Sequence, residues 1–166
     1  MQRYFNRRIS LQLIAATALP ANLLVDKAAH AHHGWSSFDL DRPVYLEGKA
    51  SKVKWQSAHT ELTLDLTPGI KLPADLATRS IPAQSAPVDA AALLQKATLP
   101  KRADKFWEIE LAPISRMNAW KVAEIKDGQP LAVLGFTFKD EKGSAILRAE
   151  FLWLDGKTYA LRSSPA

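Results

Sequence analysis

Alternation of hydrophobic and polar residues predicts a chain that is mainly β-strand after residue 42. The pattern has a period of two in segments 43–55, 60–66, 106–112, 130–139, 144–154 and 157–162. In the first segment, the alternation changes parity between Ala50 and Val53, which predicts a β-bulge near Ser51 or Lys52. We therefore expect the first strand to be long and bent.

One face of each segment is expected to be buried. In 60–66 the hydrophobic face carries Leu62, Leu64 and Leu66, opposite Glu61, Thr63 and Asp65. In 106–112 it carries either Phe106 or Trp107, followed by Ile109 and Leu111. In 144–154 it carries Leu147, Ala149, Phe151 and Trp153, opposite Arg148 and Glu150. These faces predict one continuous core.

A single helix and a hairpin complete the predicted order of elements. Hydrophobic residues recur at helical intervals in 113–124, which predicts one helix of about three turns. Residues 140–143, Asp-Glu-Lys-Gly, are typical of a tight hairpin between two strands. Three strands, a helix and further strands predict a mainly β fold: a small OB-like β-barrel of five to six antiparallel strands. A β-sandwich is the alternative, because the same alternation suits two packed sheets.

The segment 68–105 interrupts the strand pattern. It holds prolines at positions 68, 73, 82, 87 and 100, which exclude a central strand, and a helical candidate at 88–97. We expect a loop insertion with one short helix. It is either a mobile surface insertion or a lid over a site.

The first 31 residues resemble an export signal. Arg3, Arg7 and Arg8 precede an interrupted apolar run, and Ala29-His30-Ala31 is a pattern that signal peptidase cleaves. The paired arginines also resemble a twin-arginine signal. We expect a signal peptide at 1–31, an N-terminal arm at 32–42 and the barrel domain at 43–166. The mature protein would be periplasmic or secreted, with no stable membrane anchor after cleavage.

Composition narrows the function classes. The expected signal holds four of the 22 basic residues and one of the 17 acidic ones, so the mature net charge is about +2, which does not suggest a nucleic-acid partner. The chain has no cysteine, so the fold cannot depend on disulfides. No nucleotide-binding loop, nucleophile elbow or acid–base constellation appears, so no catalytic residue is assigned. We expect a binding or accessory module rather than an enzyme, acting with a co-exported protein.

The mature sequence resembles a family of small exported bacterial proteins of unknown function. The resemblance is carried by residues 31–39, 43–66, 107–122, 128–140 and 147–162. Members of that family commonly begin the mature chain with His-His and later carry Trp-x-Asn-Pro-His. Here the second motif reads Trp-Gln-Ser-Ala-His over residues 55–59, so Ser57 and Ala58 replace Asn and Pro. The resemblance implies export and the barrel fold, and no reaction.

Histidines at the expected mature terminus suggest copper. If cleavage follows Ala31, the amine and imidazole of His32 could bind one ion, with His59 as a third nitrogen ligand and His33 as a substitute or neighbour. If it follows Ala29, His30-Ala31-His32 could bind Cu(II) in a plane. The alternative is that these histidines are solvated and that His59 serves a turn. The sequence thus leaves a copper site as a hypothesis beside the binding module.

Overall fold

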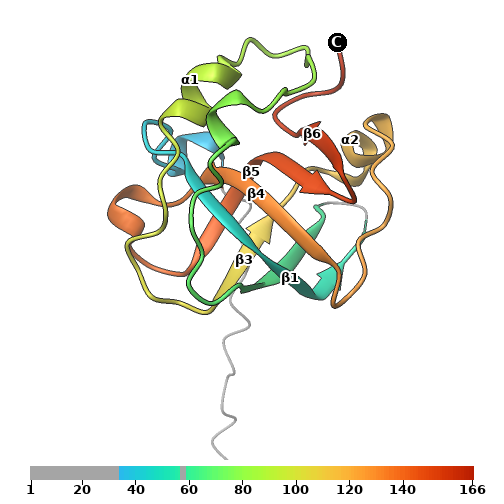
Figure 1. Ribbon diagram of the computed structural model, residues 1–166. Coiled ribbons are helices and arrows are strands. Elements are labelled where there is room, and N and C mark those ends of the chain that lie inside the picture. The colour runs from blue at the N-terminus through green and yellow to red at the C-terminus, as the bar shows by residue number, and fades with distance from the viewer. Residues whose placement is uncertain (1–33, 57–58) are drawn as a thin grey trace, which may run out of the picture. The chain divides into compact units, whose positions relative to one another are not determined.

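The computed structural model describes residues 34–56 and 59–166. Its strands are β1 (Val44–Lys54), β2 (Glu61–Leu66), β3 (Phe106–Glu110), β4 (Pro130–Phe136), β5 (Ile146–Leu154) and β6 (Lys157–Ala160). They pair in the order β3-β2-β1-β4-β5-β6, and β3 also pairs with β5 (Figure 1). Strands β1 to β5 therefore close into a barrel, with β6 added to β5. The predicted small β-barrel is confirmed.

One pairing in the barrel is parallel, which corrects the expectation of antiparallel strands throughout. Strand β3 pairs with β5 in parallel, from Glu108 opposite Ile146 to Glu110 opposite Arg148. The other pairings around the ring are antiparallel. Directions cannot alternate all the way around a ring with an odd number of strands, so one pair must be parallel.

The predicted bulge in β1 is confirmed. The register with β2 shifts between Ser51 and Lys54, and Lys52 has a positive φ of 49°. After this shift, Val53 and Trp55 pack against the same hydrophobic cluster as Val44, on the opposite parity. The bulge bends β1 after the part that pairs with β4, within the part that pairs with β2.

A second bulge, in β5, was not predicted and changes the expected faces. Leu134 pairs with Phe151 while the next residue, Gly135, pairs with Ala149, so Glu150 is the extra residue. Because the parity changes there, Phe151 and Trp153 do not share a face with Leu147 and Ala149. Leu152 and Leu154 point into the barrel instead, and the single predicted face was wrong beyond Ala149.

The barrel interior holds the main hydrophobic cluster, closed at one end by a helix. Met117, on α2 (Ile114–Ala119), has no exposed surface and packs among the barrel residues. The helix is shorter than the predicted 113–124. It ends at Ala119 with Trp120 as its C-cap, and the following residue, Lys121, has a left-handed φ of 54° that stops the helical hydrogen bonding.

The insertion 68–105 packs on the barrel as a second layer. It contains a short 3₁₀ turn (Leu76–Thr78) and α1 (Ala90–Gln95), where Asp89 accepts a hydrogen bond from the Ala92 amide at 3.0 Å. Leu76 and Leu94 are buried against the outer side of β1, β4 and β5, on Tyr45, Leu134 and Phe151. We call this outer side the covered face. The insertion contains the predicted short helix and packs on this face of the barrel.

The loop 137–145 is not the predicted tight hairpin. It contains a 3₁₀ turn (Lys139–Glu141) that directs the buried Glu141 towards the insertion. Its carboxylate accepts hydrogen bonds from the amides of Lys101 and Arg102 and from the Arg42 guanidinium. Through these hydrogen bonds, Glu141 connects the loop 137–145 with the insertion and with the arm before β1.

Among the described residues, no helix is both long and apolar enough to cross a bilayer.

Candidate functional site

The outer side of β1, β2 and β3 carries polar side chains in register. Ser51 on β1 lies opposite Thr63 on β2, which lies opposite Glu108 on β3. In the next row, Asp65 lies opposite Phe106. Directly opposite residues of antiparallel strands have their Cβ atoms roughly 5 Å apart, so these side chains form one surface. We call this surface the open face.

Phe106 is the most exposed large hydrophobic side chain among the described residues. Its exposed fraction is 61%, while its neighbour Trp107 is fully buried in the barrel. This settles the alternative left open by the sequence, in which either Phe106 or Trp107 would be buried. A solvent-exposed aromatic ring on a paired strand presents a large apolar surface that the fold itself leaves mostly uncovered.

Two hollows meet at Phe106. The first has a volume of about 490 Å³ and is lined by residues 65–70, 99–100 and 102–106. The second has a volume of about 590 Å³ and lies between the open face and the end of loop 137–145. Asp65 and Phe106 line both. Both volumes are in the range of small-molecule sites.

The two hollows differ in chemistry. The first is lined mainly by apolar side chains: Leu66, Pro68, Ile70, Leu99, Pro100, Ala103 and Phe106. The second is lined mainly by polar ones: Ser51, Lys52, Thr63, Asp65, Glu108 and Ser144. A ligand that spanned both would meet an apolar surface at one end and hydrogen-bonding groups at the other.

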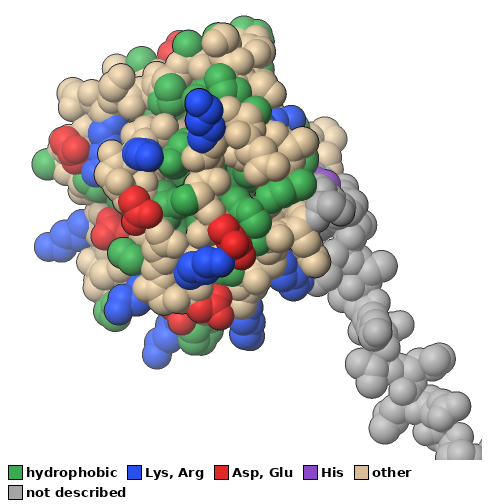
Figure 2. All heavy atoms as spheres, turned by 90° about the vertical axis from the view of Figure 1, so that its right-hand side faces the viewer, with side chains coloured by type: hydrophobic (Ala, Val, Ile, Leu, Met, Phe, Trp, Pro, Cys, Tyr) green, Lys and Arg blue, Asp and Glu red, His purple; other side chains and the backbone are tan. Residues whose placement is uncertain are grey.

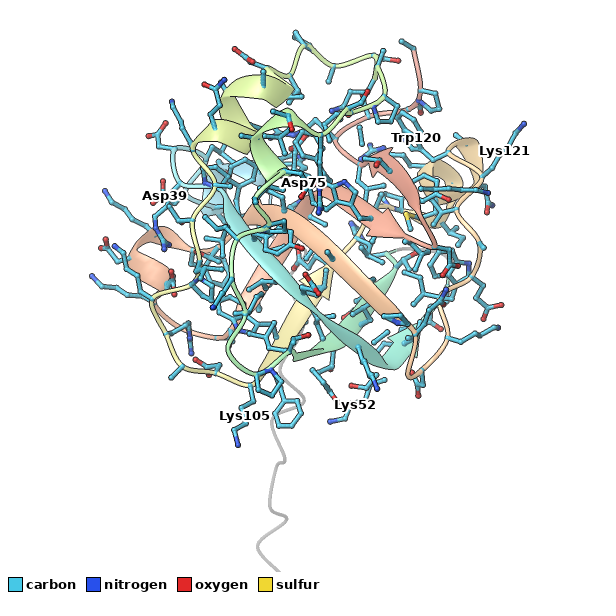
Figure 3. The ribbon with its side chains drawn as sticks, viewed as in Figure 1. Asp39, Lys52, Asp75, Lys105, Trp120 and Lys121 are labelled. Atoms are coloured by element: carbon cyan, nitrogen blue, oxygen red, sulfur yellow. The ribbon has the colours of Figure 1, made fainter. Side chains whose placement is uncertain are left out.

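Two of the charged side chains that line the first hollow, Arg102 and Asp104, pair with each other. Nε and Nη2 of Arg102 donate to the Asp104 carboxylate, and this hydrogen bonding holds the pKa of Asp104 below its usual value. Lys105 is exposed and lies at the same end of the barrel as Lys52 (Figure 3). The face in Figure 2 also mixes charged side chains of both signs with hydrophobic ones. No single-sign patch appears on that face.

Of the predicted metal ligands, the structure describes His59. It lies between β1 and β2, is half-buried, and its Nδ1 atom is shielded from solvent. His32 and His33 lie outside the described residues, so the predicted copper site is not tested. Among the residues described, no group of three or more His, Cys, Asp or Glu side chains could hold a metal ion.

The arm that follows His33 is anchored on the barrel by aromatic residues. Trp35, in a 3₁₀ turn (Trp35–Ser37), packs edge-on against Phe136 with ring centroids 6.2 Å apart. Phe38 stacks on Phe138 at 5.1 Å, with an interplanar angle of 8°. These two ring contacts hold the arm against the barrel.

Two arginines pack against Trp35. The guanidinium carbons of Arg162 and Arg148 lie 3.7 and 4.7 Å from the centre of its ring. Arg148 pairs with Glu110 at 3.2 Å, and Glu110 lies opposite Glu61 in the β2–β3 pairing. His59 is two residues before Glu61. The anchored arm and His59 therefore lie at the same end of β2 and β3.

Sequence reasoning missed the open face as a site. It placed Thr63 and Asp65 outward, correctly, but the pattern Phe-Trp cannot show which ring is buried. The register of β3 against β2 decides it, because Leu64 pairs with Trp107 and Asp65 with Phe106. The second hollow also needs loop 137–145, which is far from β2 in the chain.

The comparison with known proteins relates part of the chain to a family, but this family has no known activity. Residues 21–72 match a family of unknown function, DUF6152. The matched stretch contains β1, β2 and the loop that carries His59. The predicted resemblance to a family of unknown function is thus confirmed over this part of the chain. Neither the curated proteins nor the solved structures gave a significant match.

Proposed function

We propose that this protein is a binding module whose ligand site is the open face around Phe106. The observation that carries the proposal is the 61% exposed ring of Phe106 between two hollows of small-molecule size. OB-like barrels commonly bind ligands on the face of their second and third strands and in adjacent loops. In this protein, residues of β2, β3 and the adjoining loops line both hollows, which supports a binding site at the same place.

The ligand is expected to place an apolar group against Phe106 and the first hollow. Burying apolar surface stabilises a complex by roughly 25 cal/mol per Å², so a ring of this size is an effective anchor. We assign the open face no reaction.

The test uses Nile red, a neutral apolar dye whose fluorescence rises in apolar surroundings. The purified protein is expected to bind the dye in a one-to-one ratio, and Phe106→Ser is expected to weaken binding at least tenfold. Leu72→Ser is the matched control, because Leu72 is also exposed, at 41%, and lines neither hollow. Equal binding by all three proteins, or none by the unchanged protein, would overturn the proposal.

The module is proposed to act outside the cytoplasm, beside a co-exported protein. Support comes from the basic start, the apolar run and the Ala29-His30-Ala31 cleavage pattern. Intact mass of the protein recovered from the periplasm tests this proposal. We expect a mature chain that begins at His32, and a mass that includes Met1 contradicts export with cleavage.

Copper binding by His32, His33 and His59 is the second candidate function. The observation that favours it is the position of the arm: Trp35, two residues after His33, is fixed at the end of β2 and β3 that also carries His59. A terminal amine with two imidazoles suits Cu(II), which prefers nitrogen ligands in a tetragonal arrangement.

Three proteins separate a copper site from nonspecific binding. They are the mature protein, a variant with one extra residue before His32, and His59→Ala. The mature protein should bind one Cu(II), and each variant should bind more weakly with a changed paramagnetic resonance spectrum. Affinity should fall with decreasing pH because protons compete for the same nitrogens. Equal binding by all three would exclude this site.

A further inference from the structure

The paired hollows carry information about the class of ligand, beyond the presence of a binding site. The first has a mainly apolar lining, the second is lined by six polar side chains together with Phe106 and Ala145, and the two share the wall formed by Asp65 and Phe106. These two residues are direct partners across β2 and β3, so they mark the line between the hollows. A ligand that fills both must be apolar at one end and polar at the other.

The polar end is expected to donate hydrogen bonds. The carboxylates of Asp65 and Glu108 are hydrogen-bond acceptors only, and both belong to the second hollow. Ser51 already donates to Asp65 Oδ1 at 2.8 Å, which fixes this carboxylate in place and leaves lone pairs for a ligand.

Lys52 does not reverse this preference. It is exposed at the bulge of β1, whereas Asp65 and Glu108 are half-buried on paired strands. A solvated lysine side chain is screened by water and can turn away, while half-buried carboxylates are held and less screened. The second hollow therefore favours a cationic head over an anionic one.

We propose that the open face binds a small amphiphile with an apolar chain in the first hollow and a protonated amine in the second. The amine would donate charge-assisted hydrogen bonds to Asp65 and Glu108, which are about twice as strong as neutral ones. The chain would pack on Phe106, Leu66 and Ile70. This inference rests on the proposed function, because it assigns a ligand class to the same site.

Displacement of Nile red by three amphiphiles with the same chain length tests the inference. Decylamine, decyl maltoside and decyl sulfate, each below its micelle concentration, carry a cationic, a neutral and an anionic head. Decylamine is expected to displace the dye at a concentration at least tenfold lower than decyl sulfate, and lower than decyl maltoside. A preference for the maltoside or the sulfate overturns the assignment of an amine.

Variants of the carboxylates locate the source of the preference. Asp65→Asn combined with Glu108→Gln keeps the shape of the second hollow and removes its charge, so the preference for decylamine over decyl sulfate should fall below threefold. Glu61→Gln is the matched control, since Glu61 lies on β2 and lines neither hollow. A preference that persists in the double variant overturns the inference. If Nile red binds through Phe106 but no head group is preferred, the proposed function stands and this inference fails.

Discussion

The covered face and the open face of the barrel lie on neighbouring strands, but the first is buried and the second is exposed to solvent. The covered face carries Tyr45, Leu134 and Phe151, each at 1% exposure or less, beneath the insertion. The open face carries hydroxyls and carboxylates around Phe106, which is 61% exposed. The middle of the insertion thus buries one side of the barrel, whereas its start and end border the open face and leave Phe106 exposed.

The largest expected effect comes from the covered face. Phe151→Ala should lower the free energy of unfolding by about 3–5 kcal/mol, because a buried ring is lost and a cavity remains under the insertion. Urea unfolding of the purified protein measures it. A loss below about 1 kcal/mol would mean that the insertion does not depend on this face.

The next effect concerns the contact that holds the insertion to loop 137–145. Glu141→Gln should cost about 1–3 kcal/mol, because the side chain is 3% exposed and accepts bonds from Lys101, Arg102 and Arg42. These hydrogen bonds outweigh burial and keep the pKa of Glu141 below its usual value. Its contribution to stability is therefore present above the ordinary pKa of a glutamate and is lost as the pH falls through the lowered value.

Unfolding at neutral and at acid pH checks this second prediction. The difference between Glu141→Gln and the unchanged protein should shrink as the pH falls. Glu61→Gln serves as the control, because its partner Lys54 is half exposed, and this pair should contribute about 0–1 kcal/mol. A difference that grows in acid would contradict the assigned role of Glu141.

Glu150 is expected to have a smaller effect on stability, and its dependence on pH is opposite to that of Glu141. Burial raises the pKa of this carboxyl despite the Arg162 guanidinium, which contacts it at 2.6 Å. A raised pKa in the folded state means that the protonated form is favoured there, so stability should fall as the pH rises from the ordinary pKa through the raised one. Glu150→Gln should remove this slope. Melting temperatures across that pH interval test it, and an unchanged slope would assign the dependence to another group.

The smallest effect on stability is expected on the open face. Phe106→Ala should change the free energy of unfolding by no more than about 0.5 kcal/mol, because the ring is mostly solvated already. The same urea experiment compares it directly with Phe151→Ala. A cost above about 2 kcal/mol would show that Phe106 stabilises the fold, and its exposure would then need another explanation.

Local pattern was sufficient to predict most of the barrel. The alternation of hydrophobic and polar residues predicted the strands, and the change of parity after Ala50 predicted the first bulge. Both features depend on residues that are neighbours in the sequence. The second bulge, at Glu150, left no such signal, because residues 151–154 that follow it are hydrophobic at every position and β5 is buried on both sides there. Burial under a distant insertion cannot be inferred from the strand itself.

The candidate site depended even more on contacts distant in sequence. The hollows join β2 and β3 with loop 137–145 and with the start and end of the insertion. The pattern predicted that Asp65 points outward, but the exposure of Phe106 follows from the register between strands. The histidine hypothesis, in contrast, rests on residues of which the structure describes only His59, and it stays a prediction.

The most direct test of the central claim is a map of backbone amide shifts on adding decylamine to the ¹⁵N-labelled protein. We expect the shifted amides to cluster on the open face and its hollows, at residues 51–52, 63–70, 99–108 and 144–145. The chemical shifts of amides on the covered face, such as those of Tyr45 and Trp153, should not change. Shifts confined to the covered face or to the arm near Trp35, with none around Phe106, would contradict the account.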